Sequence, residues 1–102
     1  MSTFAFTAEN GIPFVARRVD KGENYGRDER IAHQEDDPLI EFYDTRHPHT
    51  KYGQFVSRYY LSTLQKRDQN QGLCLDGGNA DVWSIDSGSL STVLKELSAS
   101  NH

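Results

Sequence analysis

Four side chains that can do chemistry lie close together near the middle of the chain: Asp44, Arg46, His47 and His49. In an extended segment alternate side chains point to the same side, so His47 and His49 would face one way. Two imidazoles with a third ligand, from Asp44 or His33, would suit Zn²⁺ or Ni²⁺. A small metal-dependent hydrolase that uses Asp44, His47 and His49 is one functional hypothesis. It is kept as an alternative to the leading one, because the sequence shows no separate nucleophile or oxyanion-stabilising element.

Two other interpretations of the same stretch stay open. A His-Pro-His sequence is also typical of a solvated turn, and no distant His/Cys pair completes a tetrahedral set of ligands. The planar guanidinium of Arg46 can instead bind an anion or a partner protein. Our leading expectation includes no cofactor and no metal, with metal binding kept as the alternative.

Two apolar, aromatic-rich runs flank this turn and must position it. Residues 39–43 predict a short strand that begins after Pro38. Residues 54–64 fit either a strand or a helix, and their aromatic and β-branched content favours a strand. Loops held between such strands often carry function, so the turn is the candidate site.

Tyr59 and Tyr60 extend this candidate site. Neighbouring side chains of a strand point to opposite faces, so one tyrosine should join the core while the other lies outside beside Arg58 and Arg46. An exposed tyrosine next to arginine would suit a contact surface for a protein or a nucleotide, and an ordinary sheet face has the same appearance. The residues expected to bind a partner are therefore Arg46, His47, His49, Tyr59 and Tyr60.

The remaining elements predict an α+β fold. Asn10-Gly11 is typical of a type I′ turn in a hairpin between residues 3–8 and 13–19. Short strands are expected at 73–75 and 82–85, the first with a buried, inert Cys74. Leucine and valine at 90, 93, 94 and 97 mark one face of a helix that Asp86 or Ser87 would cap. Residues 1–102 should form a single domain: an antiparallel sheet of four to six strands with the C-terminal helix packed on one face, against Phe42, Phe55 or Tyr59, and Trp83.

Charge and composition narrow the function classes. The net charge of −4 lies within residues 20–37, which hold seven acidic and three basic residues and should form an exposed, mobile loop. No basic patch is visible, so nucleic-acid binding is not expected. The N-terminus lacks the features of a secretory signal, no apolar run is long enough to span a membrane, and a single cysteine suits a reducing compartment. We therefore expect a cytoplasmic protein.

Several blocks of the sequence resemble one group of proteins. They are residues 25–28 (YGRD), 37–44 (DPLIEFYD), 53–64 (GQFVSRYYLSTL) and 75–78 (LDGG). These blocks are similar to those of short uncharacterised proteins encoded on proteobacterial integrative and conjugative elements and genomic islands. The resemblance spans residues from about 25 to 98, and it implies a bacterial, cytoplasmic accessory protein without implying a reaction.

The leading functional hypothesis is a non-enzymatic binding or regulatory protein that acts through protein contacts. It rests on the small size, the acidic segment and the lack of a complete catalytic constellation. A second alternative to the metal-dependent hydrolase is an acidic DNA mimic that antagonises host defence. Mimicry of a duplex needs a long regular array of negative charge, which one short acidic segment supplies poorly.

Overall fold

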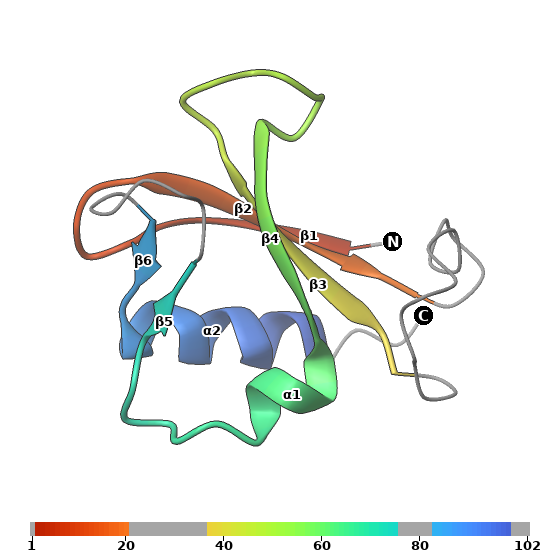
Figure 1. The fold of residues 1–102 in the computed structure, drawn as a ribbon, viewed down its shortest axis with the longest axis vertical. Helices are drawn as coiled ribbons and strands as arrows, with labels where there is room; N and C mark the ends of the chain where they lie inside the picture. Colours follow the sequence, from red (N-terminus) through yellow and green to blue (C-terminus); the bar gives the residue numbers. More distant parts are fainter. Residues whose placement is uncertain (1, 21–36, 76–82, 99–102) are drawn as a thin grey trace.

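A computed structural model describes residues 2–20, 37–75 and 83–98 of the chain (Figure 1). Within those ranges the protein forms a four-stranded antiparallel sheet in the order β1-β2-β3-β4, a two-stranded sheet of β5 and β6, and two helices. The elements are β1 (Ser2–Thr7), β2 (Pro13–Val19), β3 (Leu39–Asp44), β4 (Gln54–Tyr60), α1 (Leu61–Gln65), β5 (Leu73–Cys74), β6 (Ser84–Ile85) and α2 (Ser87–Ser98). The predicted α+β class, with an antiparallel sheet and a C-terminal helix, is confirmed.

The first hairpin forms as expected, but its turn is longer than predicted. β1 and β2 pair from Ser2 opposite Arg18 to Thr7 opposite Pro13. Beyond them the amide of Ala8 donates to the carbonyl of Ile12 (3.0 Å), which leaves three residues in the turn instead of the two of a type I′ turn. Gly11 adopts the left-handed region (φ +91°), as in a three-residue hairpin loop that ends in a glycine.

β3 is the central element of the main sheet. It pairs with β2 on one side and with β4 on the other, and all six of its residues are buried. A β-bulge in the β3–β4 pairing falls between Phe42 and Tyr43. The connection to β4 requires glycine at Gly53, where φ is +124° and a Cβ atom would lie 2.6 Å from the carbonyl oxygen of Asp44.

The segment 54–64 is part strand and part helix, so the strand prediction is wrong beyond Tyr60. The amide of Leu61 still donates to the carbonyl of Pro38 (2.8 Å), and α1 begins at this residue. Asp37 then accepts hydrogen bonds from the amide (3.2 Å) and the hydroxyl (2.7 Å) of Ser62. Helical spacing lets Leu61 and Leu64 both enter the core, which a continued strand would not allow.

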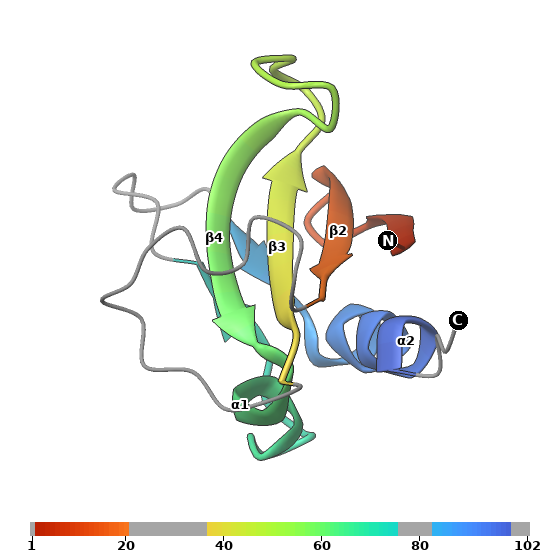
Figure 2. The same cartoon turned by 90° about the vertical axis from the view of Figure 1, so that its right-hand side faces the viewer.

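The C-terminal helix α2 matches its prediction closely. Asp86 is the N-cap, because its carboxylate accepts a hydrogen bond from the amide of Ser89 (3.0 Å). The four apolar residues of the predicted face, Leu90, Val93, Leu94 and Leu97, are all buried in the main core cluster. The helix lies below the sheet, mainly against β1 and also against β2 and α1 (Figures 1 and 2).

The main core includes Phe42 and Trp83, with Tyr59 packed at its margin. Phe55, a predicted helix contact, is instead 43% exposed. Cys74 is exposed on β5 instead of buried, a second correction. The expected loop at 21–36, the turn at 76–79 and the start of the strand at Val82 lie outside the described residues. No helix in the described ranges has the length and apolar character needed to cross a membrane.

Candidate functional site

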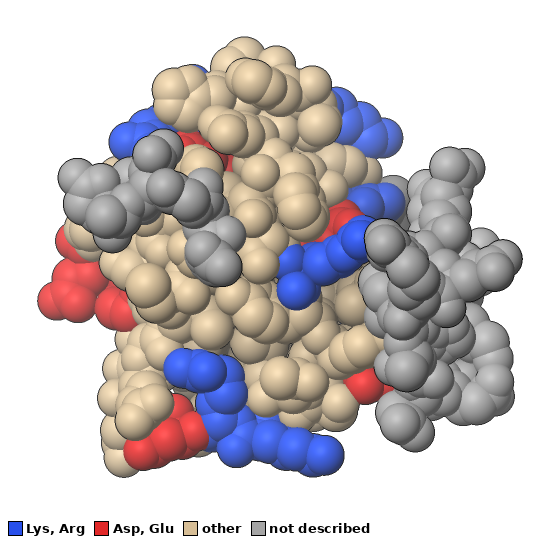
Figure 3. Space-filling model, in the orientation of Figure 1, with Lys and Arg blue, Asp and Glu red and all other residues tan. Residues whose placement is uncertain are grey.

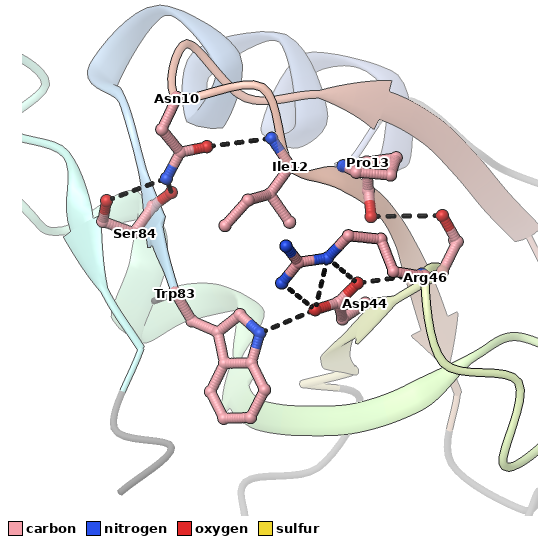
Figure 4. A network of polar contacts seen from close by, with 8 residues as sticks. Asn10, Ile12, Pro13, Asp44, Arg46, Trp83 and Ser84 are labelled. Carbon is pink, nitrogen blue, oxygen red and sulfur yellow. Dashed lines mark hydrogen bonds and ion pairs between the residues drawn. The ribbon is translucent and has the colours of Figure 1, made fainter. Parts of the chain in front are cut away.

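Asp44 ends β3 with a fully buried carboxylate that several donors surround (Figure 4). The guanidinium of Arg46 binds it through Nε (3.1 and 3.2 Å) and a terminal nitrogen (2.7 Å), and the Arg46 amide donates at 2.9 Å. The indole Nε1 of Trp83, which is 39 residues further along the sequence, also donates to the Asp44 carboxylate (2.9 Å). The hydrogen bonds from Arg46, opposed by burial and aided by Trp83, hold the pKa of Asp44 well below its ordinary value.

These contacts give Asp44 a structural role. Its carboxylate joins the end of β3 to the residue before β6, and the fork of Arg46 points to Asp44 instead of outward. The amide of His49 donates to the carbonyl of His47 (2.9 Å), so the backbone turns tightly there and the extended spacing assumed from the sequence does not apply. Both histidines are exposed, and the described residues contain no group of three His, Cys, Asp or Glu side chains able to hold a metal.

A second set of polar contacts fastens the first hairpin to β6 and α2. The amide of Glu9 donates to Asp86 (2.7 Å), and the side-chain amide of Asn10 donates to the carbonyl and hydroxyl oxygens of Ser84 (3.3 Å each; Figure 4). Burial raises the pKa of Asp86, but the hydrogen bonds from Glu9 and Ser89 outweigh it and lower the pKa. Glu9, Asn10, Ser84, Ile85 and Asp86 line an open hollow of about 310 Å³. Its polar groups largely bind one another.

A cluster of aromatic and basic side chains lies on the sheet face opposite the helix. We call it the aromatic patch: Arg17, Tyr43, Phe55 and Arg58 lie on strands of the sheet, and Lys51 and Tyr52 adjoin them from the β3–β4 connection. The ring of Tyr43 lies 5.3 Å from that of Tyr52 and 5.7 Å from that of Phe55. Among the described residues Phe55 is the one large apolar side chain that is exposed. Figure 3, which looks at the molecule with β4 in front, shows basic and acidic groups meeting near the middle of largely uncharged surface.

Cations lie over the rings of this patch. The guanidinium of Arg17 is 4.9 Å from the centroid of Tyr52, and the ammonium of Lys51 is 5.3 Å from the same centroid. The guanidinium of Arg58 is 6.0 Å from the centroid of Phe55. All three distances fall within the range in which a cation is attracted to a ring face.

The buried carboxylate of Glu41 contacts three side chains of the patch. One of its oxygens accepts hydrogen bonds from Arg17 (2.6 Å) and from the hydroxyl of Tyr43 (2.8 Å), while the other lies 3.9 Å from Arg58. Burial and the hydrogen bond to Glu41 raise the pKa of Tyr43 to about 12, so the phenol stays neutral. Burial would lower the pKa of Arg17, but Glu41 more than compensates and raises it.

The structure does not bring all the binding residues predicted from the sequence onto one exposed surface. Tyr59 and Tyr60 point to opposite faces as predicted: Tyr59 packs edge-on to Phe42 (6.3 Å) at the core, and Tyr60 packs against Val19 and Leu39. Neither is fully exposed, and Arg46 turns towards Asp44. Within the described ranges the exposed aromatic residue is Phe55, which strict alternation would place on the core face with Tyr59.

The bulge explains why the sequence misplaced Phe55. It shifts the register so that Phe55 lies opposite Tyr43, whereas Ser57 lies opposite Phe42. Phe55 therefore lies on the opposite face of the sheet from the one that a regular strand would give it. No residue in 54–58 indicates the bulge from the sequence alone. The role of Glu41 was also missed, because its partner Arg17 is 24 residues away in the sequence.

Comparisons with known proteins add no assignment: no family model, no curated protein and no solved structure matches this chain.

Proposed function

We propose that this protein is a non-enzymatic binding or regulatory module that acts through protein contacts at the aromatic patch. One observation carries the proposal: Phe55 is 43% exposed on an ordered strand and lies beside Arg58. Aromatic residues, phenylalanine included, and arginine are enriched at the cores of protein interfaces.

The position of Tyr43, Phe55 and Arg58 on paired strands supports this role. Tyr43 lies on the fully buried strand β3, and Phe55 and Arg58 lie on β4, which pairs with β3 along its length. A preorganised surface loses little conformational entropy when a partner binds. The net charge of −4 and the calculated isoelectric point of 5.4 favour a protein partner over the phosphate backbone of a nucleic acid.

No observation in the described ranges favours the two alternative functions, a metal-dependent hydrolase and an acidic DNA mimic. A metal-dependent hydrolase would need Asp44, whose carboxylate is engaged by Arg46 and Trp83. A DNA mimic would depend on the acidic segment, most of which lies at 21–36, outside the described residues. We further propose, from the sequence resemblance alone, that the module serves as a cytoplasmic accessory protein of a bacterial mobile element.

The test is affinity capture from the native host with wild-type protein, Phe55→Ala and a control, Thr63→Ala, which alters an exposed residue of α1. A protein captured by the wild type and the control is then purified and titrated calorimetrically. We expect Phe55→Ala to bind it roughly thirtyfold more weakly, because truncating a central aromatic residue of an interface costs about 2 kcal/mol or more. Equal affinities for Phe55→Ala and wild type would exclude the aromatic patch as the binding surface.

A further inference from the structure

We propose that the partner presents an acidic segment to the aromatic patch, in which carboxylates flank an apolar side chain. This inference rests on the proposed function and adds the chemistry of the partner. The apolar side chain would pack on the exposed ring of Phe55, and a carboxylate would bind Arg58.

The charges of the patch favour an acidic partner. Arg17 donates to Glu41, whereas Lys51 and Arg58 are the charged side chains of the patch that are exposed. The exposed charges of the patch are therefore both positive, although the whole chain has a net charge of −4. Complementary charge of this kind steers association and excludes partners of the wrong sign.

Arg58 is the residue best placed to bind the carboxylate. Its side chain is 41% exposed, and its distance of 3.9 Å from Glu41 is too long for a hydrogen bond. Arg17 differs, since its side chain is only 13% exposed and donates to Glu41 at 2.6 Å. The guanidinium of Arg58 thus combines exposure with a planar set of donors that matches a carboxylate.

A single-stranded nucleic acid fits the patch less well. Such ligands stack successive bases on several open rings along a basic groove. Here Tyr43 is 7% exposed, and Tyr52 has Arg17 and Lys51 against its ring, which leaves Phe55 as the exposed ring of the patch. One open ring with an adjacent arginine suits one apolar side chain and one carboxylate.

The test uses fluorescent peptides of equal length that carry a central leucine flanked by aspartate and glutamate, by serine, or by lysine. A single-stranded oligonucleotide serves as a fourth probe, and binding is followed by fluorescence anisotropy. We expect the acidic peptide to bind at least tenfold more tightly than the serine peptide, with an affinity that falls as salt is added. The inference is overturned if no peptide binds, if the serine or lysine peptide binds as well, or if the oligonucleotide binds most tightly.

Arg58→Gln and Lys66→Gln form a matched pair of variants, because each removes one exposed positive charge and only the first lies in the patch. Arg58→Gln should weaken the acidic peptide roughly tenfold, whereas Lys66→Gln should leave it unchanged, with circular dichroism showing that both fold. An equal loss of affinity in both variants would show that only the net charge of the protein matters, which would contradict the inference. If Phe55→Ala abolishes capture of the native partner but the peptides do not discriminate, the proposed function stands and the acidic partner fails.

Discussion

Replacing Asp44 by asparagine tests whether this carboxylate holds the β3 end to the residue before β6. An amide of the same shape keeps one acceptor oxygen, but its NH₂ group then faces a donor of Arg46 or Trp83. A buried donor left without a partner costs about 1–3 kcal/mol. The loss of the ion pair with Arg46, whose side chain is 42% exposed, adds to this cost.

We therefore expect Asp44→Asn to lower the free energy of unfolding by about 2–3 kcal/mol, a large share of the ~5–15 kcal/mol typical of a domain. Trp83 is the single tryptophan, so its fluorescence reports the transition directly. With a urea dependence of about 1–3 kcal/mol per molar, the urea midpoint should fall by about 1–2 M.

Arg46→Ala is the matched control, because it removes the exposed partner and leaves the bond between Asp44 and Trp83 (2.9 Å) intact. It should lower the urea midpoint by less than Asp44→Asn does, because the carboxylate keeps the donors of Trp83 and of the backbone amide at position 46. If Asp44→Asn unfolds within 0.5 kcal/mol of the wild type, or if Arg46→Ala costs as much as Asp44→Asn, the buried Asp44–Trp83 contact is not what stabilises this end of the sheet.

Three further outcomes are expected. Leu94→Ala should destabilise the protein by about 2–5 kcal/mol in chemical denaturation, since it leaves a cavity where α2 meets the core; an unchanged midpoint would show that the helix is peripheral. Gly53→Ala should destabilise by more than about 1 kcal/mol, because the new Cβ would lie 2.6 Å from the Asp44 carbonyl, and Gly11→Ala, where nothing lies within 4 Å, should cost less; the reverse order of their melting temperatures would contradict this. The pKa values of Asp44 and Asp86 are lowered on folding, so their contribution to the free energy of unfolding is present above the ordinary aspartate pKa of about 3.9 and is lost as the pH falls further. The wild type should therefore lose stability between about pH 5 and 2 more steeply than Asp44→Asn. Parallel curves of stability against pH would argue against a lowered pKa of Asp44.

The elements with strong local patterns could be predicted from the sequence. The period of Leu90, Val93, Leu94 and Leu97 locates both α2 and its buried face, and Asp86 identifies its start. The first hairpin follows from Asn10-Gly11, although the number of turn residues depends on the pairing of Ala8 with Ile12. In such segments local preference and tertiary packing agree.

The candidate site was less predictable because it depends on contacts between distant residues. Asp44 binds Trp83 across 39 positions, and nothing near Asp44 in the sequence indicates that its carboxylate is buried. The bulge that turns Phe55 outward arises from the pairing of β3 with β4, so residues 54–58 alone still suggest a regular alternation. The two strands that flank the turn were predicted correctly from the sequence, whereas a binding role for the turn side chains stays a prediction.

The most direct test of a protein-binding aromatic patch is photo-cross-linking in the native host. A photoreactive phenylalanine analogue replaces Phe55 in one version of the protein and Thr63, on the exposed surface of α1, in another. We expect illumination to give a discrete covalent adduct with one host or element protein from the first version, and no such adduct from the second. The absence of an adduct at Phe55, or the same adduct from both positions, would contradict the proposal that this patch binds a protein partner.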